Sequence, residues 1–200
     1  RMAGSMEVKG SRIYLWAENE TSENQAFRMR ISLKKMDFTV IERVTASGNA
    51  EAFSSACGVW IDLEDCSTYQ RLKQSSGSDE DPDEKMFLEG VVEYENGTVR
   101  RSVETLLPYK YLSLPQPVFT TEVFREKTAY KIRLKADSFA AFVELSVEGS
   151  DVIFSENYFH MTDREPKVIT LKDEDISGTT VEDADDLARR IRIRSAADIS

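Results

Sequence analysis

The stretch FRMRISLK, residues 27–34, alternates apolar and polar side chains without interruption. A period of two residues places the apolar side chains on one face of a strand and the polar ones on the other. Residues 13–17 and 129–136 repeat this pattern. Shorter runs of the same character cover residues 38–44, 58–63, 87–94, 98–106, 118–124, 142–147, 152–154 and 168–171. The chain is therefore predicted to be all-β, with antiparallel sheets that each bury one face.

A proline-rich segment, residues 108–117 (PYKYLSLPQP), interrupts the succession of strands. Proline removes a backbone donor and restricts both itself and the preceding residue, so this segment predicts a short, stiff connector between domains. The expected organisation is a first sandwich over residues 6–114 and a second over residues 115–200. Residues 1–5 are interpreted as an expression-tag remnant, since no apolar signal-peptide segment follows them.

Several short motifs predict turns and loops. Asn96-Gly97 lies between two strand-like runs and predicts a type I′ hairpin turn, which needs positive φ at both positions. Gly48-Asn49 marks another turn. Asn96-Gly97-Thr98 and Asn19-Glu20-Thr21 also match the N-glycosylation sequon, but a turn requires no secretion and is the preferred interpretation. The polar, acidic residues 72–85 predict a mobile, solvated loop.

One short helix is predicted near the C-terminus. Thr180 is its expected N-cap, with Asp183 in the position of a capping box. Acidic residues in the first turns and arginines in the last match the helix macrodipole. The apolar residues at helical spacing are Val181, Ala184, Leu187, Ala188 and Ile191. Residues 191–194 then predict a short strand.

Composition excludes several classes of function. The formal net charge is −10 and the sequence pI is about 4.8, which argues against binding to nucleic acid. No apolar run approaches the roughly 20 residues of a membrane span, so no membrane association is expected. Cys57 and Cys66 are expected to be free thiols, and with the single His160 far away they do not predict a metal site. No cofactor is expected.

Catalytic motifs are not evident in the sequence. His160 has no nucleophile motif beside it, and it is interpreted as a surface or turn histidine. The carboxylates lie mostly in charge runs or on polar strand faces, where they stay ionised, whereas a general acid needs a raised pKa. The sequence thus assigns no catalytic residue to this chain.

Aromatic residues form one candidate binding surface. Tyr14 and Trp16 share the face of a strand opposite Ile13 and Leu15, and Trp60 alternates with apolar neighbours in the same way. Such a face can stack sugars, or it can pack against a neighbouring domain or within a core. Tyr14, Trp16 and Trp60 are therefore the sugar-binding candidates, with domain packing as the favoured alternative.

Four segments in series carry a resemblance to a known family. Residues 154–161 (FSENYFHM) and 165–171 (EPKVITL) resemble the last Ig-like domain of β-mannosidases in glycoside hydrolase family 2. In that family a Ser-Asp-Asn-Tyr-Phe-Asp segment, Pro-Gly-Glu and a closing strand occur in this order. The other three segments are a connector, residues 107–117, a C-terminal ending, residues 193–198, and a domain start, residues 14–20 (YLWAENE).

The resemblance implies two consecutive Ig-like sandwiches that follow a (β/α)8 barrel. It implies retaining hydrolysis by two glutamates on that barrel, so no catalytic residue carries over to this chain. Asn157 and Tyr158 are expected to form a structural corner where the chain crosses between sheets. The favoured hypothesis is a non-catalytic accessory region whose partner is the barrel of the parent chain. A carbohydrate-binding module and a free-standing adhesin or receptor fragment are the alternatives. A bacterial cytoplasmic location is expected.

Overall fold

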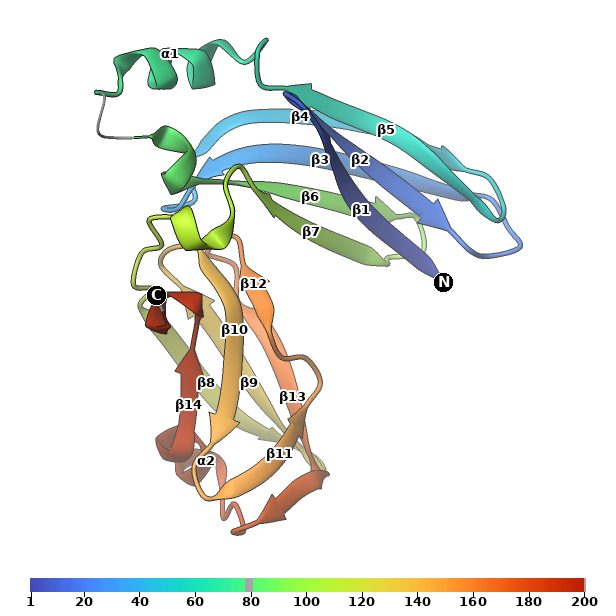
Figure 1. Cartoon of the computed structure of the whole chain (residues 1–200). Helices are drawn as coiled ribbons and strands as arrows, with labels where there is room; N and C mark the ends of the chain where they lie inside the picture. Colours follow the sequence, from blue (N-terminus) through green and yellow to red (C-terminus); the bar gives the residue numbers. More distant parts are fainter. Residues whose placement is uncertain (78–80, 200) are drawn as a thin grey trace. The chain divides into compact units, whose positions relative to one another are not determined.

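The computed structural model describes residues 1–77 and 81–199 (Figure 1). The chain divides into two compact units, Arg1–Ser113 and Leu114–Ser200. Antiparallel strands dominate both units. The chain is thus all-β, as the alternating sequence pattern predicts.

A three-stranded sheet forms one layer of the first unit. Its strands are ordered β1 (Met2–Lys9), β2 (Arg12–Asn19) and β5 (Ser54–Asp62), and both pairings are antiparallel. Met2–Ser5 belong to β1, and the Tyr94 hydroxyl donates a hydrogen bond to the Ala3 carbonyl over 2.6 Å. The origin of residues 1–5 in an expression tag stays a prediction, but four of them are built into the sheet.

A four-stranded sheet forms the other layer of this unit. Its order is β4 (Val40–Ala50), β3 (Gln25–Lys35), β6 (Met86–Tyr94) and β7 (Val99–Thr105). The FRMRISLK stretch lies in β3, and its four apolar side chains are all buried. These side chains join the apolar faces of β2 and β5 in one shared core.

Glycines allow close packing in this core. A Cβ atom on Gly48 would lie 2.9 Å from Cζ of Phe27, and one on Gly90 would lie 2.7 Å from Cδ1 of Leu15. Gly48-Asn49, predicted as a turn, lies instead within β4 and pairs with Phe27 and Ala26. The prediction was wrong because this glycine makes room for an aromatic ring; it does not supply a turn conformation.

A helix and a 3₁₀ turn occupy much of the segment predicted as a loop. Helix α1 spans Ser67–Ser75, and Pro82–Lys85 form a 3₁₀ helix; residues 78–80 lie outside the described part of the chain. Lys73 Nζ contacts Asp81 over 2.8 Å and Asp83 over 2.9 Å. Lys73, on α1, therefore partly neutralises the acidic run. The sequence predicted a single helix, so α1 was not predicted.

The Asn96-Gly97 hairpin joins β6 to β7 by a different turn from the predicted one. Gly97 has a φ of +82°, whereas Asn96 does not have a positive φ. The Gly97 amide donates to the Tyr94 carbonyl over 2.9 Å, and the Tyr94 amide donates to the Thr98 carbonyl. This pattern is a three-residue loop with glycine in the left-handed position, so the type I′ prediction was wrong while the hairpin was right.

The second unit is one seven-stranded antiparallel sheet that curls around its own core. Strand order runs β12–β10–β11–β13–β9–β8, and β14 pairs with β10 outside this path. The bounds are Phe119–Glu126 (β8), Ala129–Ala136 (β9), Ala140–Val147 (β10), Ser150–Phe154 (β11), Phe159–Met161 (β12), Lys167–Gly178 (β13) and Ile191–Arg194 (β14).

Helix α2 (Ala184–Arg190) is shorter than predicted. Asp183, not Thr180, is its N-cap, and its side chain accepts from the Asp186 amide over 2.8 Å. Leu187 is fully buried in the core of this unit. The helix starts later because a side-chain cap is available at Asp183, three residues past Thr180. Strand β14 begins directly after it, as predicted.

Two further 3₁₀ helices complete the described elements: Tyr109–Tyr111 in the first unit and Ala196–Asp198 in the second. The latter begins with a reciprocal capping box between Ser195 and Asp198. Within residues 1–77 and 81–199, no helix is long and apolar enough to cross a membrane.

Candidate functional site

The three predicted aromatic residues lie on the same face of the β1–β2–β5 sheet, opposite the core. Tyr14 on β2 is the cross-strand partner of Trp60 on β5, and Trp16 is the partner of Cys57. A register shift between Leu15 and Trp16 accounts for this spacing. The fold thus brings Tyr14, Trp16 and Trp60 together, although 44 positions separate Trp16 from Trp60 in the sequence.

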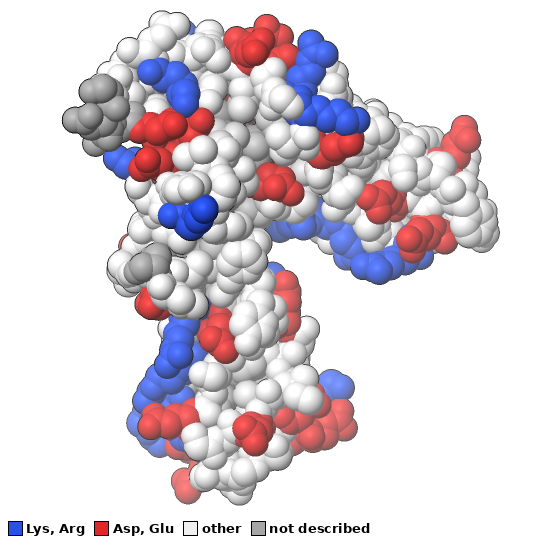
Figure 2. All heavy atoms as spheres, viewed as in Figure 1, with Lys and Arg blue, Asp and Glu red and all other residues white. Residues whose placement is uncertain are grey.

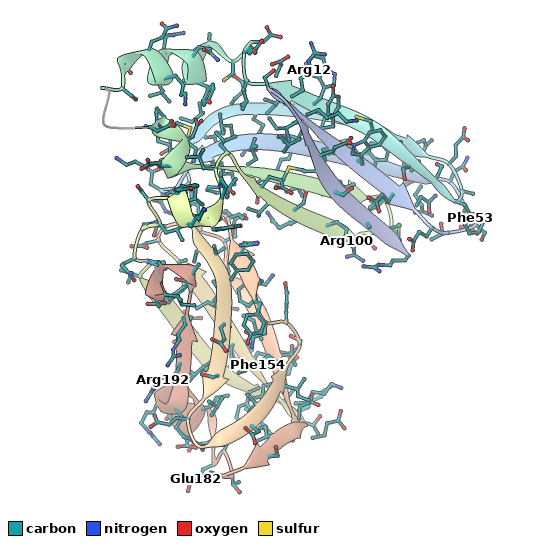
Figure 3. The ribbon with its side chains drawn as sticks, in the orientation of Figure 1. Arg12, Phe53, Arg100, Phe154, Glu182 and Arg192 are labelled. Carbon is teal, nitrogen blue, oxygen red and sulfur yellow. The ribbon has the colours of Figure 1, made fainter. Side chains whose placement is uncertain are left out.

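Charged side chains surround this aromatic face. The Arg12 guanidinium lies 5.4 Å from the ring centroid of Trp60, and Lys9 Nζ lies 5.7 Å from that of Tyr14. Arg12 also pairs with Asp62 over 2.7 Å, which lowers the pKa of that carboxyl. Figure 3 labels Arg12 at the start of β2. Cations held over aromatic rings are attracted to the negative face of the ring.

The exposure of the three aromatic rings differs. Trp60 is 48% exposed, whereas Tyr14 and Trp16 are only partly exposed. Stacking of a sugar needs ring faces open to solvent, and Arg12 occupies space beside one of them. This face therefore mixes apolar area with fixed charge pairs, which is the composition of interfaces between domains as much as that of sugar platforms.

A second surface, not found from the sequence, lies on the far side of the four-stranded sheet. Two adjoining hollows of about 500 and 470 Å³ are lined there by residues of β3, β4 and β6. Arg28, Arg30 and Glu93 line the second hollow, and Arg30 pairs with Glu93 over 2.9 Å. The sequence signal was the alternation of Arg28 and Arg30 on the polar face of FRMRISLK. Figure 2 shows further Lys and Arg along the margin of the first unit, where Figure 3 labels Arg100.

The predicted corner of the second unit is built on a side-chain amide. Asn157 Oδ1 accepts from the Leu145 amide over 2.8 Å, and Asn157 Nδ2 donates to the Leu145 carbonyl over 3.0 Å. Tyr158 has a φ of +57°, and its hydroxyl donates to Glu144 over 3.0 Å. Both contacts tie the segment between β11 and β12 to β10. They hold the backbone of this segment in place.

His160 lies in strand β12, not in a turn. Its ring stacks on Phe139 at 6.1 Å and contacts Phe142 at 4.8 Å, and burial lowers its pKa. The prediction of a turn was wrong because the imidazole packs against Phe139 and Phe142, about 20 residues earlier in the sequence, and this packing holds His160 in a strand.

Groups suited to acid–base or metal chemistry are sparse in the described chain. Burial raises the pKa of Glu104 on β7, the direction that a general acid requires. Glycoside hydrolysis needs two carboxyl groups on opposite sides of the bond, so Glu104 alone does not make such a site. Cys57 and Cys66 are free thiols. Among residues 1–77 and 81–199, no three His, Cys, Asp or Glu side chains are placed to hold a metal ion.

The second unit matches a family model. Both units are built of antiparallel sheets around an apolar core, and the second contains an Ig fold. Residues 114–199 match the Ig_mannosidase model, an Ig-fold domain. This agrees with the resemblance carried by residues 154–171. No curated protein sequence matches the chain.

Solved structures of glycosidases share the fold of both units. The β-D-mannosidase from Dictyoglomus thermophilum superposes with a TM-score of 0.74 at 15% identity, covering 98% of this chain and 21% of that one. The exo-chitosanase CsxA from Amycolatopsis orientalis gives a TM-score of 0.55 at 14% identity, covering 96% and 25%. The chain therefore spans about a fifth to a quarter of the length of these enzymes.

Proposed function

We propose that this chain is the non-catalytic C-terminal accessory region of a β-mannosidase-like glycoside hydrolase, and that both units are Ig-like sandwiches. The observation that carries the proposal is the extent of the structural likeness. A TM-score of 0.74 over 98% of the chain includes both units in their order along the chain, within about a fifth of the length of a β-D-mannosidase. The match of residues 114–199 to the mannosidase Ig-fold model supports it independently.

In this proposal, bond cleavage belongs to a (β/α)8 barrel elsewhere in the parent protein. The parent enzyme hydrolyses terminal β-glycosidic bonds with retention of configuration, using two carboxyl groups of that barrel. The function of a protein depends on its active site and not on its fold. In this proposal the present chain contributes structural contacts to the parent enzyme and no catalytic residue. Tyr14, Trp16 and Trp60 form the docking face of the first unit for the barrel, where burial of aromatic area is most favourable.

A turnover assay with the purified chain tests the non-catalytic role. Aryl β-mannoside and aryl β-glucosaminide substrates cover the two glycosidase activities named among the structural relatives. The expected rate equals that of buffer alone. Hydrolysis that co-purifies with the folded chain and is lost in Glu104→Gln would overturn the proposal, because it would locate a general acid on β7.

Hydrogen exchange tests the docking face. The full-length parent protein is expressed from its complete reading frame. The hydrogen-exchange rates of the backbone amides of β2 and β5 are then compared between the parent protein and the isolated chain. We expect stronger protection in the parent around Tyr14, Trp16 and Trp60. Equal exchange in both proteins would contradict a docked face.

Carbohydrate binding is the second candidate function, favoured by one observation: Trp60 is 48% exposed and shares its face with Tyr14 and Trp16. Both tryptophans of the chain lie on this face, so their fluorescence reports directly on a bound sugar. Titration with manno- and chito-oligosaccharides should change the emission if the face stacks sugars. Trp60→Ala should reduce the response to sugar. Tyr111→Ala, which removes another exposed aromatic side chain, is its matched control and should leave the response unchanged. A flat titration excludes this candidate.

A further inference from the structure

The two N-glycosylation sequons occupy opposite environments in the first unit. Asn19-Glu20-Thr21 begins at the last residue of β2, and Asn96-Gly97-Thr98 lies at the tip of the β6–β7 hairpin. A glycan is attached to the side-chain amide nitrogen of the asparagine, so that nitrogen must be exposed and must not be needed by the fold.

The amide of Asn19 is fully used inside the protein. Asn19 is 1% exposed, and its Nδ2 donates to the carbonyls of Glu23, Ala50 and Glu51 over 2.7, 3.1 and 2.9 Å. Its Oδ1 accepts from the amide and the hydroxyl of Thr21 over 3.0 and 2.6 Å. A sugar on Nδ2 would remove a donor proton and would require space where backbone lies. A chain that carries this glycan cannot reach the described fold.

The amide of Asn96 is open to solvent. Asn96 and Gly97 are both exposed, and a Cβ built on Gly97 would have no atom of the described chain within 4 Å, apart from its sequence neighbours. Asn96 Oδ1 accepts from the Thr98 amide over 2.9 Å, which fixes the side chain. Among residues 1–77 and 81–199, the one hydrogen-bond acceptor for its Nδ2 is the thioether of Met2, a weak acceptor, at 3.7 Å. Within the described residues, the Thr98 hydroxyl makes no hydrogen bond.

We propose that Asn96 is a site of N-glycosylation and that Asn19 is not, whenever the chain passes through a secretory compartment. In the reaction, Asn96 Nδ2 forms a bond to the anomeric carbon of a lipid-pyrophosphate-linked oligosaccharide. The bond between that carbon and the pyrophosphate oxygen breaks, the lipid pyrophosphate leaves, and the amide loses one proton to the transferase. The bond is formed at a hairpin tip, where a bulky polar group disturbs neither sheet.

Secretion of the chain from a eukaryotic cell, behind a cleavable signal, tests the proposal. The monomeric secreted protein is treated with peptide N-glycosidase in H₂¹⁸O, and its peptides are mapped by mass. We expect one glycan, with ¹⁸O in the peptide that holds residue 96 and none at residue 19. The isotope separates enzymatic release from any deamidation of Asn-Gly that preceded the label, and a sample held in H₂¹⁸O without the enzyme measures deamidation during the incubation.

Variants at the sequon threonines sharpen the result. Thr98→Ala removes the Asn96 sequon while keeping the asparagine, and should abolish the glycan mass. Thr21→Ala removes the other sequon, and should leave the glycan mass unchanged. The wild-type map decides without these variants, so loss of folding in either does not affect the outcome. A folded, secreted chain that is unmodified at Asn96, or that carries a glycan on Asn19, overturns the proposal.

Discussion

Each of the two units uses an asparagine side chain to hold a crossing segment, but the two asparagines are not equivalent. In the first unit, Asn19 is buried and serves the carbonyls of two separate segments, around Glu23 and around Ala50. In the second, Asn157 is partly exposed and makes both of its bonds across to β10 with one residue, Leu145, while its Oδ1 also accepts from the neighbouring Tyr158 amide. From this contrast we expect burial and the number of backbone groups bound, not the residue type, to determine how much such a corner stabilises its unit.

The largest expected effect is that of Asn19→Ala. It leaves the buried Ala50 carbonyl, and the less buried carbonyls of Glu23 and Glu51, without a donor from residue 19. A buried group left unpaired costs about 1–3 kcal/mol, so the first unit should lose about 3 kcal/mol of unfolding free energy. Urea unfolding followed by tryptophan fluorescence measures this unit alone, because Trp16 and Trp60 both belong to it. The control is Asn24→Ala, which loses a single exposed bond to the Ala52 amide. Equal losses in both variants would refute the argument from burial.

Gly90→Ala should destabilise the same unit by about 2 kcal/mol, since overpacking a filled core costs about 1–3 kcal/mol. The added methyl would lie 2.7 Å from Leu15 Cδ1 and 2.8 Å from Ser102 Oγ. Gly77→Ala is the control, because no atom of the described residues lies within 4 Å of its Cβ position, its chain neighbours aside. The same fluorescence measurement reports both variants, and an unchanged midpoint for Gly90→Ala would show that the core gives way without cost.

Asn157→Ala should cost the second unit about 1–2 kcal/mol, because only the backbone of Leu145 loses its partners on β10 and water can replace the amide at the partly exposed position 157. Far-UV circular dichroism, which records both units, should show a shifted transition in urea while tryptophan fluorescence does not change. A loss as large as that of Asn19→Ala would erase the distinction between the two corners.

The first unit should lose stability in alkali, through Tyr69. Burial, together with the hydrogen bond to Asp83, raises the pKa of this phenol to about 12. The folded state therefore holds the proton more tightly than the unfolded chain, whose phenol titrates near 10. Stabilisation is complete below about pH 10 and is lost as the pH rises through about 12. Tyr69→Phe, which loses about 1 kcal/mol at neutral pH, should be much less sensitive over this range.

Trp60→Ala should have the smallest effect on folding, within about 0.5 kcal/mol, because the side chain lies on the surface away from the core. The Trp16 fluorescence and circular dichroism both remain available to measure it. A loss above about 2 kcal/mol would show that the aromatic face stabilises the isolated unit itself, and would weaken its proposed role in docking.

Much of the fold could be predicted from the sequence, because strands with one buried face carry a period of two. Residues 129–136 coincide with β9, and the apolar side chains of FRMRISLK are all buried. The segments that were missed lack this pattern. Met2–Lys9 is weakly apolar and becomes a strand by pairing with β2, and the polar α1 has one buried side chain, Tyr69. Neither element carries a local signal strong enough to be predicted.

The amino-acid sequence alone predicts that the chain folds as antiparallel sheets. It also contains segments that resemble mannosidase Ig-like domains and places two asparagines in sequons. Only the tertiary structure decided which asparagine is accessible, since the carbonyls that close off Asn19 come from residues up to 32 positions away. The same holds for the pairing of Tyr14 with Trp60 and for the cation over each ring. Hydrogen bonds and ring contacts between distant strands depend on register, and register is settled only when both layers close on a common core.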